Sequence, residues 1–300
     1  MSSIEPAQRI LSYVLVPGGS GQVTVDIDIA KDLSAVNRRL YRQGMQYYVT
    51  GVSFLRVIPG VSSLSSFTAG DTWMVHNAWK KGFALWRAQQ REVLAVMPSI
   101  SPKWADFKIE LDDNSTTAID TIAGDGGTIV PDEWNISNYV WDDDGTERFP
   151  TFCLLGATAA TTKIGLIQEY HISRAEVIAG PTVPSEASDS IYAKSLGTDE
   201  MSDMLVDNVE DENDNSPYDH SEMVGGDTVA DYPHLQDMTV AFFESGGASS
   251  GGFTVECGLL RLTLGSFEND GTTPSETSHL IQVHIAPGPY KGVMATPMGQ

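Results

Sequence analysis

Residues Asp211 to Glu222, DENDNSPYDHSE, carry oxygen-bearing side chains at the spacing of an EF-hand calcium loop. Acidic or amide side chains stand at loop positions 1, 3, 5 and 9, and a glutamate closes position 12, where such loops use a bidentate carboxylate. These residues are Asp211, Asn213, Asn215, Asp219 and Glu222. Position 6, which needs glycine for its sharp turn, is Ser216, and the following MVGGDTVADYP does not suit an exiting helix. The stretch is therefore not predicted to be a true EF-hand, although its carboxylates suit calcium.

A second acidic loop, WDDDGTE (141–147), places Asp142, Asp143 and Asp144 in succession. Clustered carboxylates of this kind suit a hard cation. Because acids are abundant throughout this chain, the sequence favours a solvated acidic surface over a metal site in both loops. Calcium is the only cofactor that the sequence suggests.

Patterns typical of catalysis are weak in this sequence. A G-x-S-x-G pattern occurs once, around Ser249, but it lies in a Gly/Ser loop between two predicted strands and not on a strand-to-helix turn. The histidines and cysteines do not have zinc-ligand spacing, and neither a P-loop nor a G-x-G-x-x-G motif occurs. We therefore expect a protein that is not an enzyme.

The net charge of −22 argues against general nucleic-acid binding, which needs surplus lysine and arginine to displace phosphate counterions. The charge is unevenly distributed, however. Residues 1–110 hold 12 of the 18 basic residues and 8 of the 40 acids, a net of +4, which leaves −26 for residues 111–300. One face of the protein is expected to be mildly basic and another strongly acidic.

The sequence predicts neither a membrane span nor a disulfide framework. Apolar runs are shorter than the ~18 residues of a membrane helix, and the N-terminus lacks the cationic region of a secretion signal. Cys153 and Cys257 each lie within an apolar segment, FCLLG and VECGLL, which favours buried free thiols.

Strand patterns dominate the chain and predict an all-β protein. RILSYVLV, the turn PGGSG and the alternating QVTVDIDIA indicate a β-hairpin at residues 9–30, followed by a short helical or irregular piece, KDLSAVNRRLYRQG. A long strand, MQYYVTGVSFLRVI, comes next. The further predicted strands are 103–111, 151–158, 163–173, 237–244, 253–264 and 279–286. Nine strands with turn-rich links and no βαβ alternation favour an antiparallel sandwich or barrel.

One segment, VHNAWKKGFALWRAQQREVL (75–94), has the spacing of an amphipathic helix. Val75, Trp79, Gly82, Trp86 and Val93 fall on one side at 100° per residue. Lys80, Arg87 and Arg91 lie on the opposite side, and Pro98 ends the run. We expect this helix to lie across the sandwich with its tryptophans buried and its basic side in solvent; the alternative is a basic side that meets an anionic partner.

Residues 181–236 form an acidic segment whose only base is Lys194 and which has little strand patterning. An insertion of this length between strands is typically a functional surface or disordered. We interpret residues 1–300 as one domain that carries this insertion as a surface or interface loop.

Four stretches together resemble the capsid proteins of unclassified circular Rep-encoding single-stranded DNA (CRESS DNA) viruses. They are RRLYRQGMQYYVTGVSF, NAWKKGFALWRAQQREVL, SPKWADFKIEL and, near the end, GPYKGVMATPM. The resemblance covers the first ~110 and last ~15 residues best. The resemblance implies a single jelly-roll domain and self-assembly into a small icosahedral shell around a circular single-stranded genome. The residue patterns are compatible with this fold: eight or nine strands, one amphipathic helix inserted at about 75–94, and long acidic loops. Calcium could then bridge carboxylates of neighbouring chains.

The sequence departs from many such capsid proteins in lacking an Arg-rich N-terminal arm. Its first 30 residues contain one base, Arg9. Contact with packaged DNA would have to come from residues elsewhere, and it would be weak and sensitive to salt. The candidates are Arg38, Arg39, Arg42, Lys80, Lys81, Arg87 and Arg91.

The sequence thus favours a viral coat protein whose main partner is a large closed homo-oligomer of itself. It would be found in the virion after assembly inside the host cell, without a membrane partner. The alternative is a soluble β-sandwich binding module with calcium-dependent ligand loops. Particle formation would favour the first interpretation, and a monomer whose melting depends on calcium would favour the second.

Overall fold

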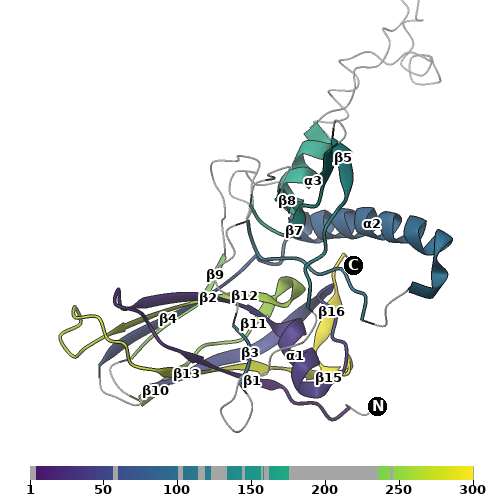
Figure 1. Ribbon diagram of the computed structural model, residues 1–300. Coiled ribbons are helices and arrows are strands. Elements are labelled where there is room, and N and C mark those ends of the chain that lie inside the picture. The colour runs from purple at the N-terminus through teal and green to yellow at the C-terminus, as the bar shows by residue number, and fades with distance from the viewer. Residues whose placement is uncertain are drawn as a thin grey trace, which may run out of the picture.

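Two antiparallel sheets form the body of the protein (Figure 1). The computed structural model describes residues 5–56, 60–100, 104–113, 119–122, 134–143, 146–156, 158, 162–175, 236–243 and 246–299. Sheet A has the order β1-β13-β3-β10, with β11 and β16 also paired to β3, and sheet B has the order β2-β12-β4-β9. Sheet A is built from β1 (Ile10–Leu15), β3 (Met45–Arg56), β10 (Gly246–Ser249), β11 (Phe253–Val255), β13 (His279–Ile285) and β16 (Ala295–Pro297). Sheet B is built from β2 (Gln22–Asp28), β4 (Val61–Thr68), β9 (Gln236–Phe243) and β12 (Leu259–Phe267).

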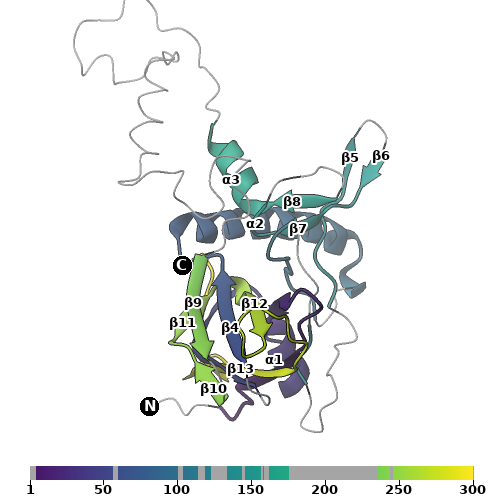
Figure 2. The same cartoon turned by 90° about the vertical axis from the view of Figure 1, so that its left-hand side faces the viewer.

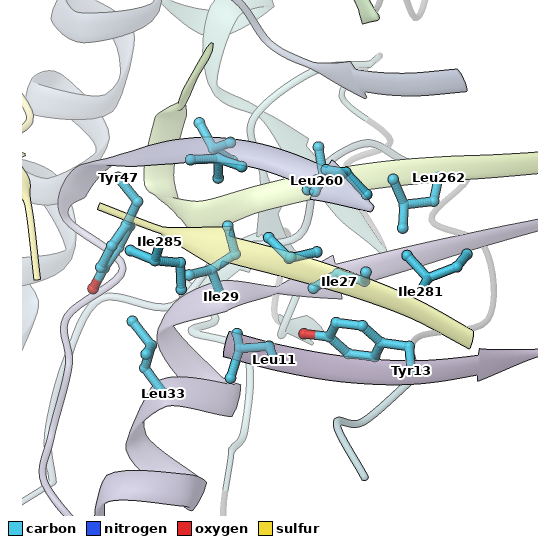
Figure 3. Close-up of a cluster of buried hydrophobic side chains, with 14 of the residues drawn as sticks. Leu11, Tyr13, Ile27, Ile29, Leu33, Tyr47, Leu260, Leu262, Ile281 and Ile285 are labelled. Carbon is cyan, nitrogen blue, oxygen red and sulfur yellow. The ribbon is translucent and has the colours of Figure 1, made fainter. Parts of the chain in front are cut away.

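The main core lies between the two sheets and under helix α1 (Ile29–Asn37) (Figure 3). The alternation of side chains along each strand explains how this core forms. In β1, every second side chain points inward, namely Leu11, Tyr13 and Leu15, and the residues between them do not. Figure 3 shows Leu11 and Tyr13 in one cluster with side chains of β2, β12 and β13, among them Ile27, Leu262 and Ile281. The expected class, a predominantly antiparallel β protein, is confirmed.

The predicted hairpin at residues 9–30 is wrong, although both of its strands exist. β1 pairs with β13 in sheet A, and β2 pairs with β12 in sheet B. The PGGSG turn therefore carries the chain from one sheet to the other. Local turn residues reveal that the chain reverses, whereas the strand partner depends on which apolar faces must be buried together.

Four other predicted strands also need correction. Of the strand predicted at 151–158, only Thr151–Cys153 is a strand, β7, and residues 154–156 are irregular. Of the strand predicted at 103–111, the described residues 104–111 form a mostly irregular segment with one isolated bridge, at Glu110. Residues 163–173 divide into a short strand, β8 (Lys163–Gly165), and helix α3 (Leu166–Ala175), because Leu166, Ile167 and Tyr170 have helical spacing. Residues 253–264 divide into β11, a 3-10 turn η4 (Glu256–Gly258) and β12; Cys257 and Gly258, with φ of 56° and 69°, turn the chain from sheet A to sheet B.

A large insertion separates β4 from β9 and packs on one side of the sandwich, as Figures 1 and 2 both show. Its own core joins side chains of α2 and α3 to Phe107 and Phe152, and it meets Leu259 and Met298 of the sandwich. Its elements are α2 (Trp73–Val96), η1 (Pro98–Ile100), β5 (Trp141–Asp143), β6 (Thr146–Arg148), β7 (Thr151–Cys153), β8 and α3. Two short strands near the C-terminus, β14 (Pro287–Gly288) and β15 (Gly292–Val293), complete the described elements.

Helix α2 confirms the helix predicted at 75–94. Thr72 caps it, since its hydroxyl accepts a hydrogen bond from the Val75 N–H at 3.3 Å. Val75, Trp79 and Gly82 are buried as expected. The second half departs from the prediction, because Trp86 is only partly buried and Val93 is exposed. The piece after β2, expected to be helical or irregular, forms helix α1, whereas helix α3 was not predicted.

Both cysteines are buried free thiols, as the sequence indicated. Among the helices of the described ranges, none is both long and apolar enough to cross a membrane. The acidic segment 181–236 lies outside the described residues, apart from Gln236 at the start of β9.

Candidate functional site

A buried ion triad joins the insertion to sheet B. Arg261 of β12 donates to Asp26 of β2, from Nε to Oδ1 at 2.7 Å and from Nη2 to Oδ2 at 2.9 Å. The same guanidinium donates to Asp112 of the insertion, at 2.6 Å from Nη1 and 3.1 Å from Nη2. Burial alone would lower the pKa of Arg261, but the two carboxylates outweigh it and raise the pKa above its usual value.

Asp28, at the end of β2, holds three parts of the chain together: the start of α1, Gln43 and Trp134. Its carboxylate caps α1 by accepting the Lys31 N–H at 3.0 Å. It also accepts from Gln43 Nε2 at 2.8 Å and from Trp134 Nε1 at 2.7 Å. Burial raises the pKa of Asp28, although these hydrogen bonds oppose the shift.

Asp32 of α1 is fully buried and holds residues 119–122 against β1. Its carboxylate accepts from the Tyr13 hydroxyl at 2.5 Å and from the Thr121 N–H at 3.4 Å. Lys31 forms an ion pair with Asp120 in the same segment. Burial raises the pKa of Asp32 to about 7.

The buried carboxylates described above, those of Asp26, Asp28, Asp32 and Asp112, join separate parts of the chain. Arginine, lysine, tyrosine and amide groups occupy the positions around the carboxylates. Within the described ranges, no group of three or more Asp, Glu, His or Cys side chains is arranged to hold a metal ion. One sequence signal points to the triad: Arg261 is a charged residue inside the apolar run LLRLTL.

The basic residues at the end of α1 form one cluster, here called the α1 basic corner: Arg38, Arg39, Arg42 and Lys291. Arg39 pairs with Glu5 at 2.8 Å, and Arg42 pairs with Asp106 at 3.0 Å. Arg38 is exposed. These acids neutralise part of the charge that an anionic partner would meet.

Lys291, in the GPYKG stretch, also belongs to the α1 basic corner, although it was not among the basic residues predicted to contact DNA. Its ammonium lies 5.3 Å from the centre of the Tyr290 ring and 5.8 Å from that of Tyr41. Burial lowers the pKa of Lys291, and the nearby charges of Arg42 and Arg39 lower it further. Only its closeness to the arginines in the fold assigns it to this cluster.

The basic residues of α2 divide into two groups. Lys80, Arg87 and Arg91 are exposed and form the predicted stripe along the helix. Lys81 turns toward α3, where its ammonium lies 5.9 Å from the centre of the Tyr170 ring. The seven basic candidates therefore lie in separate places, three just after α1 and four on α2, with Lys81 apart from the α2 stripe.

An apolar cavity of about 280 Å³ lies between α2, α3 and β7–β8. The charged residues that line it are Lys81 and Glu169. Its other lining residues are Ala78, Gly82, Leu85, Tyr139, Phe152, Thr158, Ile164, Leu166 and Tyr170. It can accept a small apolar group.

The calcium candidates fall largely outside the described residues. This holds for Asp211, Asn213, Asn215, Asp219 and Glu222, and also for Asp144. Asp142 and Asp143 belong to β5, which pairs with β6 in a hairpin. Ser249 ends β10 and is followed by β11, so its G-x-S-x-G pattern does not lie on a strand-to-helix turn.

No family model matches the chain, and neither a curated protein nor a solved structure matches it.

Proposed function

We propose that this chain is a viral coat protein with a jelly-roll fold that assembles into a closed shell around a circular single-stranded DNA genome. The observation that carries the proposal is the strand order. Numbered along the chain, the main strands are β1, β2, β3, β4, β9, β10, β12 and β13, so sheet A reads 1-8-3-6 and sheet B reads 2-7-4-5. Two Greek keys wrapped into a jelly roll produce this order, and viral capsids are among the proteins that use it.

Fold alone does not assign a function, because lectins and cupins use jelly rolls as well. The coat interpretation has two further supports. One is the resemblance of residues 38–54, of α2, of residues 101–111 and of the C-terminal stretch to capsid proteins of CRESS DNA viruses. The other is the number of large apolar side chains on the surface, including Val96 at the end of α2, which is 80% exposed.

The direct test is negative-stain microscopy of the purified chain after size-exclusion chromatography. Uniform closed particles are the expected result. A monodisperse monomer at all protein concentrations would contradict the proposal. Particles that form only when single-stranded DNA is added would show that assembly requires the nucleic acid.

Removing calcium tests the acidic loops in the same experiment. If the carboxylates of residues 211–222 or 142–144 bridge neighbouring chains, EDTA should lower the melting temperature of the particles, and added calcium should restore it. Magnesium at equal concentration is the control for ionic strength. Unchanged particle stability in EDTA would remove calcium from the proposal and leave the coat function intact.

Binding of single-stranded DNA is expected to be weak and to depend on the α2 stripe more than on the α1 basic corner. Arg39 and Arg42 already pair with acids, whereas the stripe residues are exposed. The triple variant Lys80→Ala/Arg87→Ala/Arg91→Ala should reduce the slope of log K against log salt by about 2, at about 0.7 per lost phosphate contact. Fluorescence anisotropy with a labelled oligonucleotide measures this slope. The variant Arg38→Ala/Arg39→Ala/Arg42→Ala is the matched comparison, and a larger loss in that variant would reverse the assignment.

The second candidate is a β-sandwich binding module, and the apolar cavity between α2 and α3 is the observation that favours it. A monomeric chain whose melting temperature falls in EDTA would support this function over the coat.

A further inference from the structure

Within the described strands of sheet A, the outward side chains carry no formal charge, in a chain whose net charge is −22. Side chains that point inward from its strands fill the core, so the alternate positions point away from sheet B. None of these outward residues in the described strands is Asp, Glu, Lys or Arg. We define the outer face of sheet A as Ile10, Ser12, Val14, Tyr48, Thr50, Ser53, Leu55, Gly247, Ser249, Leu280, Gln282, His284 and the adjoining Met294.

Strand register arranges the apolar residues of this face in a row. Val14 lies opposite Leu280, Leu280 lies opposite Leu55, and Leu55 lies opposite Gly247. Val14 is 48% exposed and Leu55 is 47% exposed. Four neighbouring strands thus present one continuous uncharged row to the surroundings.

The polar side chains of the face already bond to one another. Gln282 Nε2 donates to Ser12 Oγ at 3.3 Å, and Ser53 Oγ lies 2.9 Å from His284 Nε2. A neutral polar group that keeps its hydrogen bond costs little to bury. Covering this face would therefore gain apolar burial without leaving these groups unpaired.

A shallow hollow of about 330 Å³ deepens one edge of the face. Strand β10, whose sequence GGAS supplies only small side chains, contributes part of its lining. Leu55 and Leu280 are its large apolar lining residues on the outer face. The hollow gives the face a concave part into which apolar side chains of another surface can pack.

We propose that the outer face of sheet A is a contact surface between two copies of this chain; this inference rests on the proposed coat function and specifies one interface within it. The charge of the chain indicates which partner covers this face. Two chains of −22 repel each other wherever their carboxylates meet, and an acid-free face avoids that repulsion. The absence of lysine and arginine from the same face makes it a poor surface for a nucleic-acid backbone.

Two such faces can pack against each other as sheets do in a sandwich, about 10 Å apart. A contact in which each copy uses the same patch is self-complementary and is the commonest arrangement in homo-oligomers. Tyr48 and Met294, which lie side by side on the face, would add an aromatic and a flexible thioether group to the contact.

The test adds like charge to the face. In the double variant Val14→Lys/Leu55→Lys, both positions are on the surface, so the monomer should fold, with an unchanged circular dichroism spectrum. Burying four lysines in the paired faces should raise the concentration needed for assembly by at least about tenfold. Light scattering after size-exclusion chromatography measures that concentration. The control, Asn269→Lys/Ser278→Lys, adds the same charge at exposed positions of the β12–β13 connection and should assemble normally.

A complementary pair of variants makes the test independent of folding. Val14→Glu/Leu55→Glu should also fail to assemble alone, whereas a 1:1 mixture with Val14→Lys/Leu55→Lys should recover association, because opposite charges then face each other. Lysine variants that assemble like the wild type, or a mixture that does not recover, would overturn the interface and leave the coat function standing. A wild-type chain that never assembles would overturn both. Stronger retention of single-stranded DNA by the lysine variant in wild-type-like particles would assign the face to the genome instead.

Discussion

Replacing Arg261 with alanine should lower the free energy of unfolding by about 3–5 kcal/mol, which is the usual cost of breaking a buried ion pair. The guanidinium of Arg261 makes two hydrogen bonds to each of two carboxylates, and Arg261 is only 9% exposed. Without it, Asp26 and Asp112 would remain close together, buried and without their cation. The contact also joins sheet B to the insertion, so its loss should loosen both.

Urea denaturation of the chain below its assembly concentration measures this effect. Arg39→Ala is the matched control, since it removes an arginine from an exposed pair with Glu5 and should change stability by less than about 1 kcal/mol. The triple variant Asp26→Leu/Asp112→Leu/Arg261→Met should be less damaging than Arg261→Ala, because it leaves no buried charge unpaired. Equal stability of Arg261→Ala and the wild type would show that the triad does not hold the insertion.

Asp32 should make the protein less stable as the pH rises from about 4 to about 7. Burial raises its pKa from 3.8 to about 7, so the folded protein holds a proton there that the unfolded chain has released. Stability from this group is therefore complete below the unfolded pKa and is lost as the pH rises through the folded pKa. The loss should be on the order of 2–4 kcal/mol. The neighbouring charges are Lys31, which opposes the shift, and Asp28, which adds to it.

The variant Asp32→Asn should abolish this part of the pH dependence, as measured by urea denaturation at intervals between pH 4 and 8. Its amide oxygen can still accept the Tyr13 hydroxyl, although its NH₂ would face the Thr121 N–H. Asp270→Asn is the control: hydrogen bonds from Thr273 lower the pKa of Asp270 to about 2, so its contribution is lost only in more acid solution. An unchanged slope in Asp32→Asn would mean that Asp32 does not carry the effect.

Sequence periodicity predicted the elements whose buried residues alternate or recur regularly. The strand at Met45–Arg56 and the helix at Trp73–Val96 are examples. Strand β4 was missed because its apolar residues Val61, Leu64 and Phe67 are three apart, while its buried side includes Ser62. That serine is acceptable inside the protein because its hydroxyl lies 2.9 Å from both Arg56 Nη1 and His279 Nε2. These partners belong to other strands and leave no local signal.

The sequence by itself determined which side of each regular strand is apolar, the amphipathic character of α2 and the uneven distribution of charge along the chain. Only the tertiary structure decided that β1 and β2 enter different sheets, that Arg261 meets both Asp26 and Asp112, and that the outer face of sheet A collects uncharged residues from four strands. The reason is the range of the interactions. Periodicity reflects neighbours within a few residues, whereas Arg261 lies 235 positions from Asp26 and 149 from Asp112 along the chain. Partners so distant are chosen by burying all the apolar faces together, which is a property of the whole fold.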